Sequence, residues 1–116
     1  MATLGSLISK RGGNRGVVTR LLRRINNIMS DQAMERDRKI HELNKKLQKL
    51  HDKIKVLETL DSEIVQLLTE EEMATEITNA DTINALSYDT RDEAEYVLST
   101  LMAEKKRQKQ QPLTSP

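Results

Sequence analysis

The stretch IHELNKKLQKLHDKIKVLETLDSEIVQLL, residues 40–68, decides the fold of this chain. Its core positions follow one another by alternate steps of three and four residues, which is the a/d pattern of a heptad repeat. These positions, which we call the seam, are Ile40, Leu43, Leu47, Leu50, Ile54, Leu57, Asp61, Ile64 and Leu68. An apolar stripe this narrow does not stabilise a helix that has no neighbouring helix. We therefore expect a long, coiled-coil-like helix that lies against other helices.

The composition limits how wide the protein can be. Its 116 residues contain no Phe, Trp or Cys and two Tyr, and 36% are hydrophobic while 32% are charged. Such a chain cannot fill a wide core. We predict an all-α protein, either an elongated antiparallel helical hairpin or a three-helix bundle, with the seam in its long central helix.

Capping and helix-breaking residues predict where the helices begin and end. Three glycines around Asn14 favour a flexible start, with Asn14 as the N-cap of the first helix. Ser30-Asp31 suggests a turn, and the sequences from Thr69 to Glu72 and from Thr90 to Glu93 each match a capping box. The predicted segments are a flexible segment 1–13, a helical domain 14–109 with helices of about 14–29, 32–68, 70–86 and 91–109, and a disordered tail 110–116.

Charge is strongly segregated along the chain. Residues 1–30 contain no acid, whereas residues 61–100 contain eleven acids against Arg91 alone. The bases of the first segment are Lys10, Arg11, Arg15, Arg20, Arg23 and Arg24. These six side chains are candidates for nucleic-acid contact, because cations bind phosphates without regard to base sequence. The alternatives are ion pairs with the acidic third helix, a membrane-surface helix, or a mitochondrial targeting segment.

The seam could close within one chain or between two chains. In a parallel homodimer the g positions Lys39, Lys46 and Lys53 would face Asn44, His51 and Glu58 of the second copy, and one of these three pairs is complementary. This favours closure within the chain. The carboxylate in the seam, Asp61, either specifies register or partner, or else tilts to solvent or pairs with a nearby Arg or Lys.

Residues suited to catalysis or to metal binding are scarce. His41 and His51 are ten residues apart, with no cysteine to join them. The phosphate-binding, nucleophile-elbow and zinc-protease motifs are all missing. The glycines at 12–16 fit either a small anion-binding nest or the ordinary start of a helix. We predict a protein that is not an enzyme and that has no cofactor and no metal.

Three segments resemble a known family. They are KRGGNRGVVTRLL at residues 10–22, LETLDSEI at residues 57–64 and EITNAD at residues 76–81. In this order they resemble the N-terminal helical region of Gag-like polyproteins from Bel/Pao-type LTR retrotransposons of animals. The resemblance covers residues 8–105. It implies a structural segment that precedes a capsid-like region and is concerned with particle assembly and with RNA.

The expected function is that of a non-enzymatic self-association or scaffolding module of a retroelement Gag-like protein. The alternative is an RNA-binding module with a basic helix, dimerised through its coiled coil. The expected partners are a second copy, neighbouring domains of a larger polyprotein, or RNA. The chain lacks an apolar run of the roughly 18 to 20 residues that span a bilayer, so no membrane is expected. The predicted location is intracellular and cytoplasmic, with mitochondrial targeting by the basic helix left open.

Overall fold

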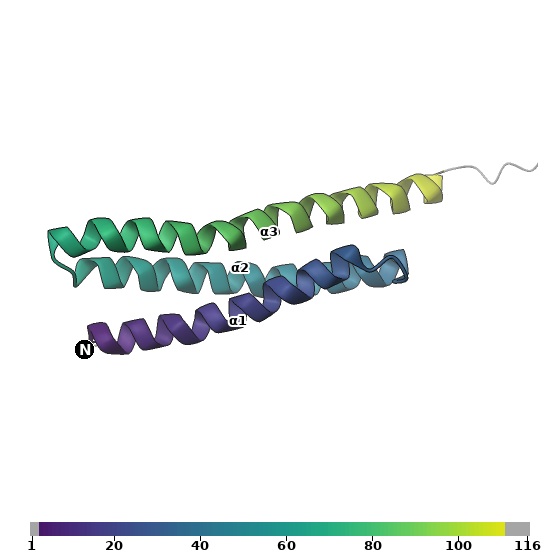
Figure 1. The fold of residues 1–116 in the computed structure, drawn as a ribbon. Coiled ribbons are helices and arrows are strands. Elements are labelled where there is room, and N and C mark those ends of the chain that lie inside the picture. Colours follow the sequence, from purple (N-terminus) through teal and green to yellow (C-terminus); the bar gives the residue numbers. More distant parts are fainter. Residues whose placement is uncertain (1–2, 111–116) are drawn as a thin grey trace, which may run out of the picture.

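The protein is a slender bundle of three antiparallel helices. The structure, a computed structural model, describes the backbone of residues 3–110 and the side chains of residues 3–108. Helices α1 (Leu4–Ser30), α2 (Arg36–Gln66) and α3 (Glu70–Gln110) lie side by side in a rod of 73 × 23 × 20 Å (Figure 1). The described residues contain no strand. The predicted all-α class is therefore confirmed, in the form of a three-helix bundle.

The seam of α2 forms the centre of the core. Ile64 is fully buried in a smaller cluster with Leu7 of α1, and Leu43 and Leu50 are fully buried in the main core with Ile25 of α1 and Ala94 of α3. Further seam residues buried in the same core are Leu47, Ile54 and Leu57. Each such side chain contributes about 1.5 to 3 kcal/mol when it leaves water. The seam is thus covered by α1 and α3 of the same chain.

The predicted flexible segment 1–13 is wrong from residue 4 onward, because α1 begins at Leu4 and runs through all the glycines, while residues 1–2 of that segment lie outside the described residues. Thr3 is its N-cap, and the Thr3 hydroxyl accepts a hydrogen bond from the backbone N–H of Ser6 at 3.1 Å. Asn14 lies inside the helix and donates to the carbonyl of Lys10. A glycine costs a helix about 1 kcal/mol relative to alanine. Burial of Leu7 against Leu60 and Ile64 of α2 offsets this cost.

Side-chain hydrogen bonds hold both connections between the helices. In the first, the Asp31 carboxylate accepts from the N–H of Ala33, and the Asp31 carbonyl accepts from Nζ of Lys39, each at 3.0 Å. These contacts keep residues 31–35 out of the helix, so α2 begins at Arg36 rather than at the predicted residue 32. In the second, Oγ1 of Thr69 accepts from the N–H of Glu72 at 3.4 Å and donates to its carboxylate at 2.8 Å. The chain reverses at both places.

The predicted break in the third helix is also wrong. Helix α3 continues through residues 87–90 as one element of 41 residues. Ser87 and Thr90 looked like the polar ends of two helices, but they are 5% and 4% exposed. They lie in line with the buried Ala80 and Ala94, at helical spacings of three, four and seven residues. These small side chains let α3 lie close against α2, so packing decides this segment instead of local capping.

The chain enters the bundle at one end and leaves it at the other (Figure 1). Gln110, which was expected in a disordered tail, is the last residue of α3, and residues 111–116 of that expected tail lie outside the described residues. In the part of the chain that the structure describes, the helices lack the long apolar stretch that crossing a membrane requires.

Candidate functional site

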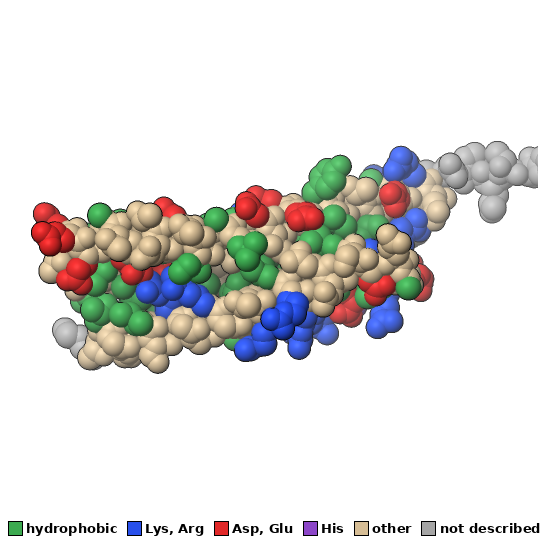
Figure 2. Space-filling view, in the orientation of Figure 1, with side chains coloured by type: hydrophobic (Ala, Val, Ile, Leu, Met, Phe, Trp, Pro, Cys, Tyr) green, Lys and Arg blue, Asp and Glu red, His purple; other side chains and the backbone are tan. Residues whose placement is uncertain are grey.

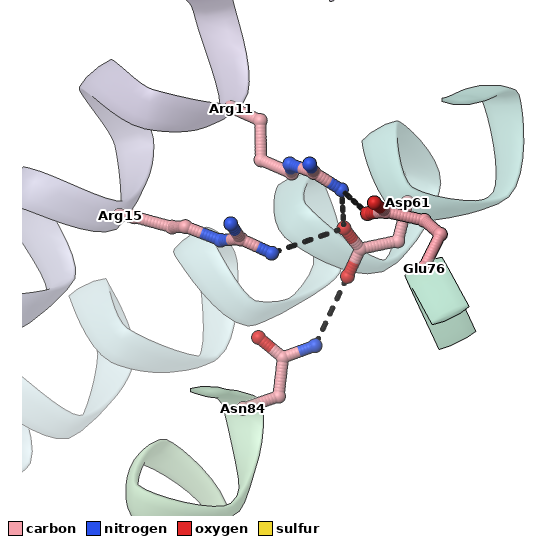
Figure 3. A network of polar contacts seen from close by, with 5 residues as sticks. All are labelled: Arg11, Arg15, Asp61, Glu76 and Asn84. Atoms are coloured by element: carbon pink, nitrogen blue, oxygen red, sulfur yellow. Dashed lines mark hydrogen bonds and ion pairs between the residues drawn. The ribbon is translucent and has the colours of Figure 1, made fainter. Parts of the chain in front are cut away.

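A cluster of polar side chains joins the three helices near one end of the rod (Figure 3). Asp61 of α2 lies at its centre. One carboxylate oxygen, Oδ1, accepts a hydrogen bond from Nη1 of Arg11 at 3.0 Å and lies 3.7 Å from Nη2 of Arg15. The other, Oδ2, accepts from Nδ2 of Asn84 at 3.0 Å, and Arg11 also pairs with Glu76. We call these five residues the ion cluster.

The two arginines of the ion cluster differ in their electrostatic state. Burial alone lowers the pKa of Arg11, but its hydrogen bonds to Glu76 and Asp61 outweigh burial and raise that pKa. Burial and the nearby charge of Arg11 lower the pKa of Arg15, whose Nε and Nη2 atoms are buried with no hydrogen-bond partner among the described residues. Two arginines and two carboxylates balance in charge. The ion cluster therefore joins α1 to α2 and α3, and both of its arginines are engaged in these ion pairs.

A second site, the basic groove, runs between α1 and α2. It has a volume of about 280 Å³, and its cationic lining is Arg20, Arg24, Lys49 and Lys53. The aliphatic side chains Val17 and Leu21 also line it, and Asp52 is the one carboxylate in its lining. Such a groove can hold an anionic chain, because its cations come from two helices that face one another.

Further cations lie close to the basic groove. Burial lowers the pKa of Lys46, and the charges of Lys49, Arg24 and Lys45 lower it further. An anion placed there would relieve this mutual repulsion. Lys53 is held in place by a hydrogen bond from its Nζ to Oδ1 of Asn14, at 3.0 Å.

The six basic residues predicted to contact nucleic acid do not form one surface. Arg11 and Arg15 belong to the ion cluster. Arg20 and Arg24 line the basic groove, whereas Arg23 is exposed outside its lining. Lys10 lies in a separate hollow beside Lys55 and Glu63 of α2. The expected patch is thus divided between four places: the ion cluster, the basic groove, the exposed position of Arg23 and the hollow beside Lys10.

The seam residues predicted as a helix interface lie inside the bundle. Ile40 and Leu68, at its two ends, are half-buried, and Asp61 reaches out of the core to Arg11. Of the alternatives for Asp61, the structure shows the pairing with a nearby arginine.

Sequence reasoning missed the lysines of the basic groove. Lys49 and Lys53 of the groove lining and the nearby Lys46 recur at helical spacing on α2, which indicates one face. Their position opposite Arg20 and Arg24 depends on the register between two helices, which this spacing alone does not reveal.

The histidines take no part in a metal site in the described part of the chain. His41 is exposed, and Nε2 of His51 lies 2.9 Å from a carboxylate oxygen of Glu95 on α3. Over the described residues, no three His, Cys, Asp or Glu side chains gather as metal ligands would.

Comparisons of the chain with protein-family models, with curated proteins and with solved structures found no match.

Proposed function

We propose that this chain is a non-enzymatic self-association or scaffolding module of a retroelement Gag-like protein. The resemblance of residues 8–105 to the N-terminal region of such polyproteins suggests the biological setting. The structural support is one observation: the two halves of a stiff rod carry opposite charge.

A plane through residues 20, 51 and 91 divides the bundle into these halves. Arg20 and Asp52 line the same groove, and His51 pairs with Glu95, which is one helical turn from residue 91 on α3, so the three positions lie within about one turn of the same level. The acidic half, residues 3–19 and 52–90, has ten Asp and Glu against five Lys and Arg. The basic half, residues 20–51 and 91–108, has thirteen Lys and Arg against eight Asp and Glu. Figure 2 shows acidic side chains over the start of α3 and basic ones beside the middle of α1.

This distribution favours association between copies. The halves carry −5 and +5 with histidines neutral, so the acidic half of one copy attracts the basic half of another. The Debye length is about 10 Å at 0.1 M salt. Each half of a 73 Å rod therefore acts separately. Because the seam is buried inside the chain, assembly uses the outer surface.

Sedimentation of the full chain at several concentrations and at two salt concentrations tests this proposal. We expect concentration-dependent association that weakens as salt is raised. A chain that remains monomeric at high concentration and low salt would refute self-association.

A matched pair of charge reversals makes the test specific. Glu70→Lys with Glu71→Lys neutralises part of the acidic half, and Asp92→Lys with Glu93→Lys makes an equal change of charge in the basic half. All four side chains are exposed. We expect the first pair to weaken association and the second pair to leave it intact or strengthen it, with helicity followed by circular dichroism. Equal weakening by both pairs would contradict the charge argument.

A second candidate function, RNA binding, has the basic groove in its favour. Four cations from two helices line it, although the described aromatic side chains, Tyr88 and Tyr96 of α3, are not among its lining residues. Binding would then be through phosphates, with little preference for base sequence.

Fluorescence anisotropy with a labelled single-stranded RNA tests this function. Arg20→Glu with Arg24→Glu should abolish binding at moderate salt and, where binding persists at low salt, reduce the salt slope by about 0.7 for each phosphate that is no longer neutralised. Lys105→Glu with Lys106→Glu is the control, because it changes the charge equally at the far end of α3. If both pairs reduce binding alike, the groove is not the RNA site.

A further inference from the structure

The connection between α2 and α3 forms an acidic end of the rod (Figure 2). Residues 56–90 contain nine Asp and Glu and no Lys or Arg. Three of these acids, Glu70, Glu71 and Glu72, are consecutive and exposed at the start of α3. No ion pair among the described residues includes Glu70 or Glu71. Leu67, beside them, is 51% exposed. We call these four residues the acidic tip.

The basic groove is complementary to the acidic tip in charge and in polarity. Its four cations and one carboxylate leave a net charge of +3, and the three glutamates give the tip −3. Val17 and Leu21 are aliphatic side chains in the groove, and Leu67 is one in the tip. An RNA strand offers phosphates for the cations but no aliphatic side chain to cover Val17 and Leu21. The lining of the groove therefore favours a protein segment that is both acidic and apolar.

The acidic tip cannot fill the groove of its own chain. Asp52 in the groove and Thr69 at the tip are seventeen residues apart. This separates the two surfaces by about 25 Å along the rod. Both surfaces are therefore available to another copy.

We propose that the acidic tip of one copy docks in the basic groove of the next copy, with the two rods parallel and staggered by about 25 Å. This proposal rests on the proposed self-association and names its two surfaces. The acidic half of one copy then lies beside the basic half of the other. The same contact in the opposite orientation would bring two acidic halves together. Because each copy binds its two neighbours through different surfaces, the contact repeats into an open chain of copies.

Charge reversals on each side of the contact test this proposal. Arg20→Glu with Arg24→Glu reverses the groove, and Glu70→Lys with Glu71→Lys reverses the tip. All four side chains are exposed, and circular dichroism checks that the variants remain folded. In sedimentation of the full chain, we expect each pair to raise the dissociation constant by at least about tenfold, a loss of about 1.4 kcal/mol.

A matched control separates the groove from the net charge of the protein. Lys106→Glu with Arg107→Glu changes the charge by the same amount as the groove reversal, at exposed positions near the end of α3. We expect this pair to weaken association less than the groove reversal does. Equal weakening would mean that net charge, and not the groove, controls association, and the proposal would fail.

A mixture of the two reversed variants provides the most specific test. The groove variant keeps its acidic tip and the tip variant keeps its basic groove, so one unaltered contact can form between them. We expect the mixture to form pairs at about the affinity of the wild-type contact, while the wild-type chain grows beyond pairs as its concentration rises.

The results of these experiments distinguish failure of this contact from failure of self-association. If the wild-type chain associates but the mixture does not, this contact is wrong while self-association stands. If the groove variant loses RNA binding but associates as before, the groove is an RNA site and the proposal is overturned. If the wild-type chain is always monomeric, both proposals fail.

Spin labels on introduced cysteines test the stagger, since the chain has no cysteine of its own. Thr75 lies one turn beyond Glu71 on α3, and Asn27 lies about one turn beyond Arg24 on α1. Both positions are exposed. In a mixture of labelled Thr75→Cys and labelled Asn27→Cys, the distance from position 75 to position 27 should be shorter than both like-with-like distances. A shorter distance between two labels at position 75 would show that the tips meet one another and would overturn the proposal.

Discussion

Asp61, the carboxylate in the seam of α2, is held by Arg11 of α1, with Oδ1 and Nη1 3.0 Å apart. Arg11 also pairs with Glu76 of α3, so one guanidinium group joins three helices. The side chains of Arg11, Asp61 and Glu76 are 8%, 16% and 19% exposed, which leaves little solvent to screen them.

Removal of the Arg11 side chain should therefore be costly. Arg11→Ala leaves two carboxylates close together with less positive charge beside them, and we expect a loss of about 3 kcal/mol in the free energy of unfolding. Urea denaturation followed by circular dichroism measures this. Arg23→Ala, at an exposed position of the same helix, should change stability by less than about 0.5 kcal/mol. A similar effect of both variants would mean that the ion cluster has no special role.

A charge in the seam should disrupt the bundle. Leu50 is fully buried, so Leu50→Asp loses its apolar packing and buries a carboxylate. We expect a cost of at least about 4 kcal/mol and a sharp fall in helicity by circular dichroism. Val56→Asp, on the same helix but at a position 37% exposed, is the control and should keep most of the helicity. Unchanged helicity in Leu50→Asp would contradict the assigned seam.

The glycines of α1 should be replaceable. Gly13 is exposed, has a helical backbone, and has open space around the position of a Cβ. Gly13→Ala should raise the free energy of unfolding by about 1 kcal/mol. Gly13→Pro should lower it by about 3 kcal/mol or more, because proline cannot stand inside a helix. Thermal unfolding distinguishes these outcomes from those of a flexible segment, which would tolerate both changes.

Alkaline pH should destabilise the protein through Tyr88. Burial and the charge of Glu58 raise the pKa of Tyr88 above its usual value of 10.0, although Arg91, 5.1 Å from the ring centroid, opposes this. The unfolded chain then loses the phenolic proton first. The stability that this group contributes is complete below pH 10 and is lost as the pH rises through the folded-state pKa.

Tyrosinate absorbance measures this shift directly, since the chain has two tyrosines and no tryptophan. In Tyr96→Phe the absorbance reports Tyr88 alone, and we expect its midpoint to lie above 10.0. A midpoint at or below 10.0 would show that burial of Tyr88 has no such effect.

The seam and the three-helix form could be predicted because they depend on periodicity, which a single sequence displays. Leu43, Leu50 and Ile64 occupy seam positions and are fully buried. The turn at Thr69 could be predicted for a similar reason, since a capping box is a local pattern.

Where the prediction failed, contacts between distant residues outweighed local preferences. The glycines of α1 disfavour a helix, yet Leu7 and Arg11 bind residues about fifty positions away in the sequence and hold the helix in place. Ser87 and Thr90 resemble helix ends, yet their small size suits them to the contact between α3 and α2. Contacts of the same kind divide the basic residues of α1, because the partners of Arg11 and the lysines that line the basic groove with Arg24 come from other helices.

An odd number of antiparallel helices makes the bundle a spacer as well as a support. Its first helix begins at one end of the rod and its last helix ends at the other. Any domains fused before Leu4 and after Gln110 would be held apart by a distance approaching the 73 Å length of the rod. The bundle sets the distance between the two points of attachment, and this distance shortens by about 1.5 Å for every residue removed from the C-terminal end of α3.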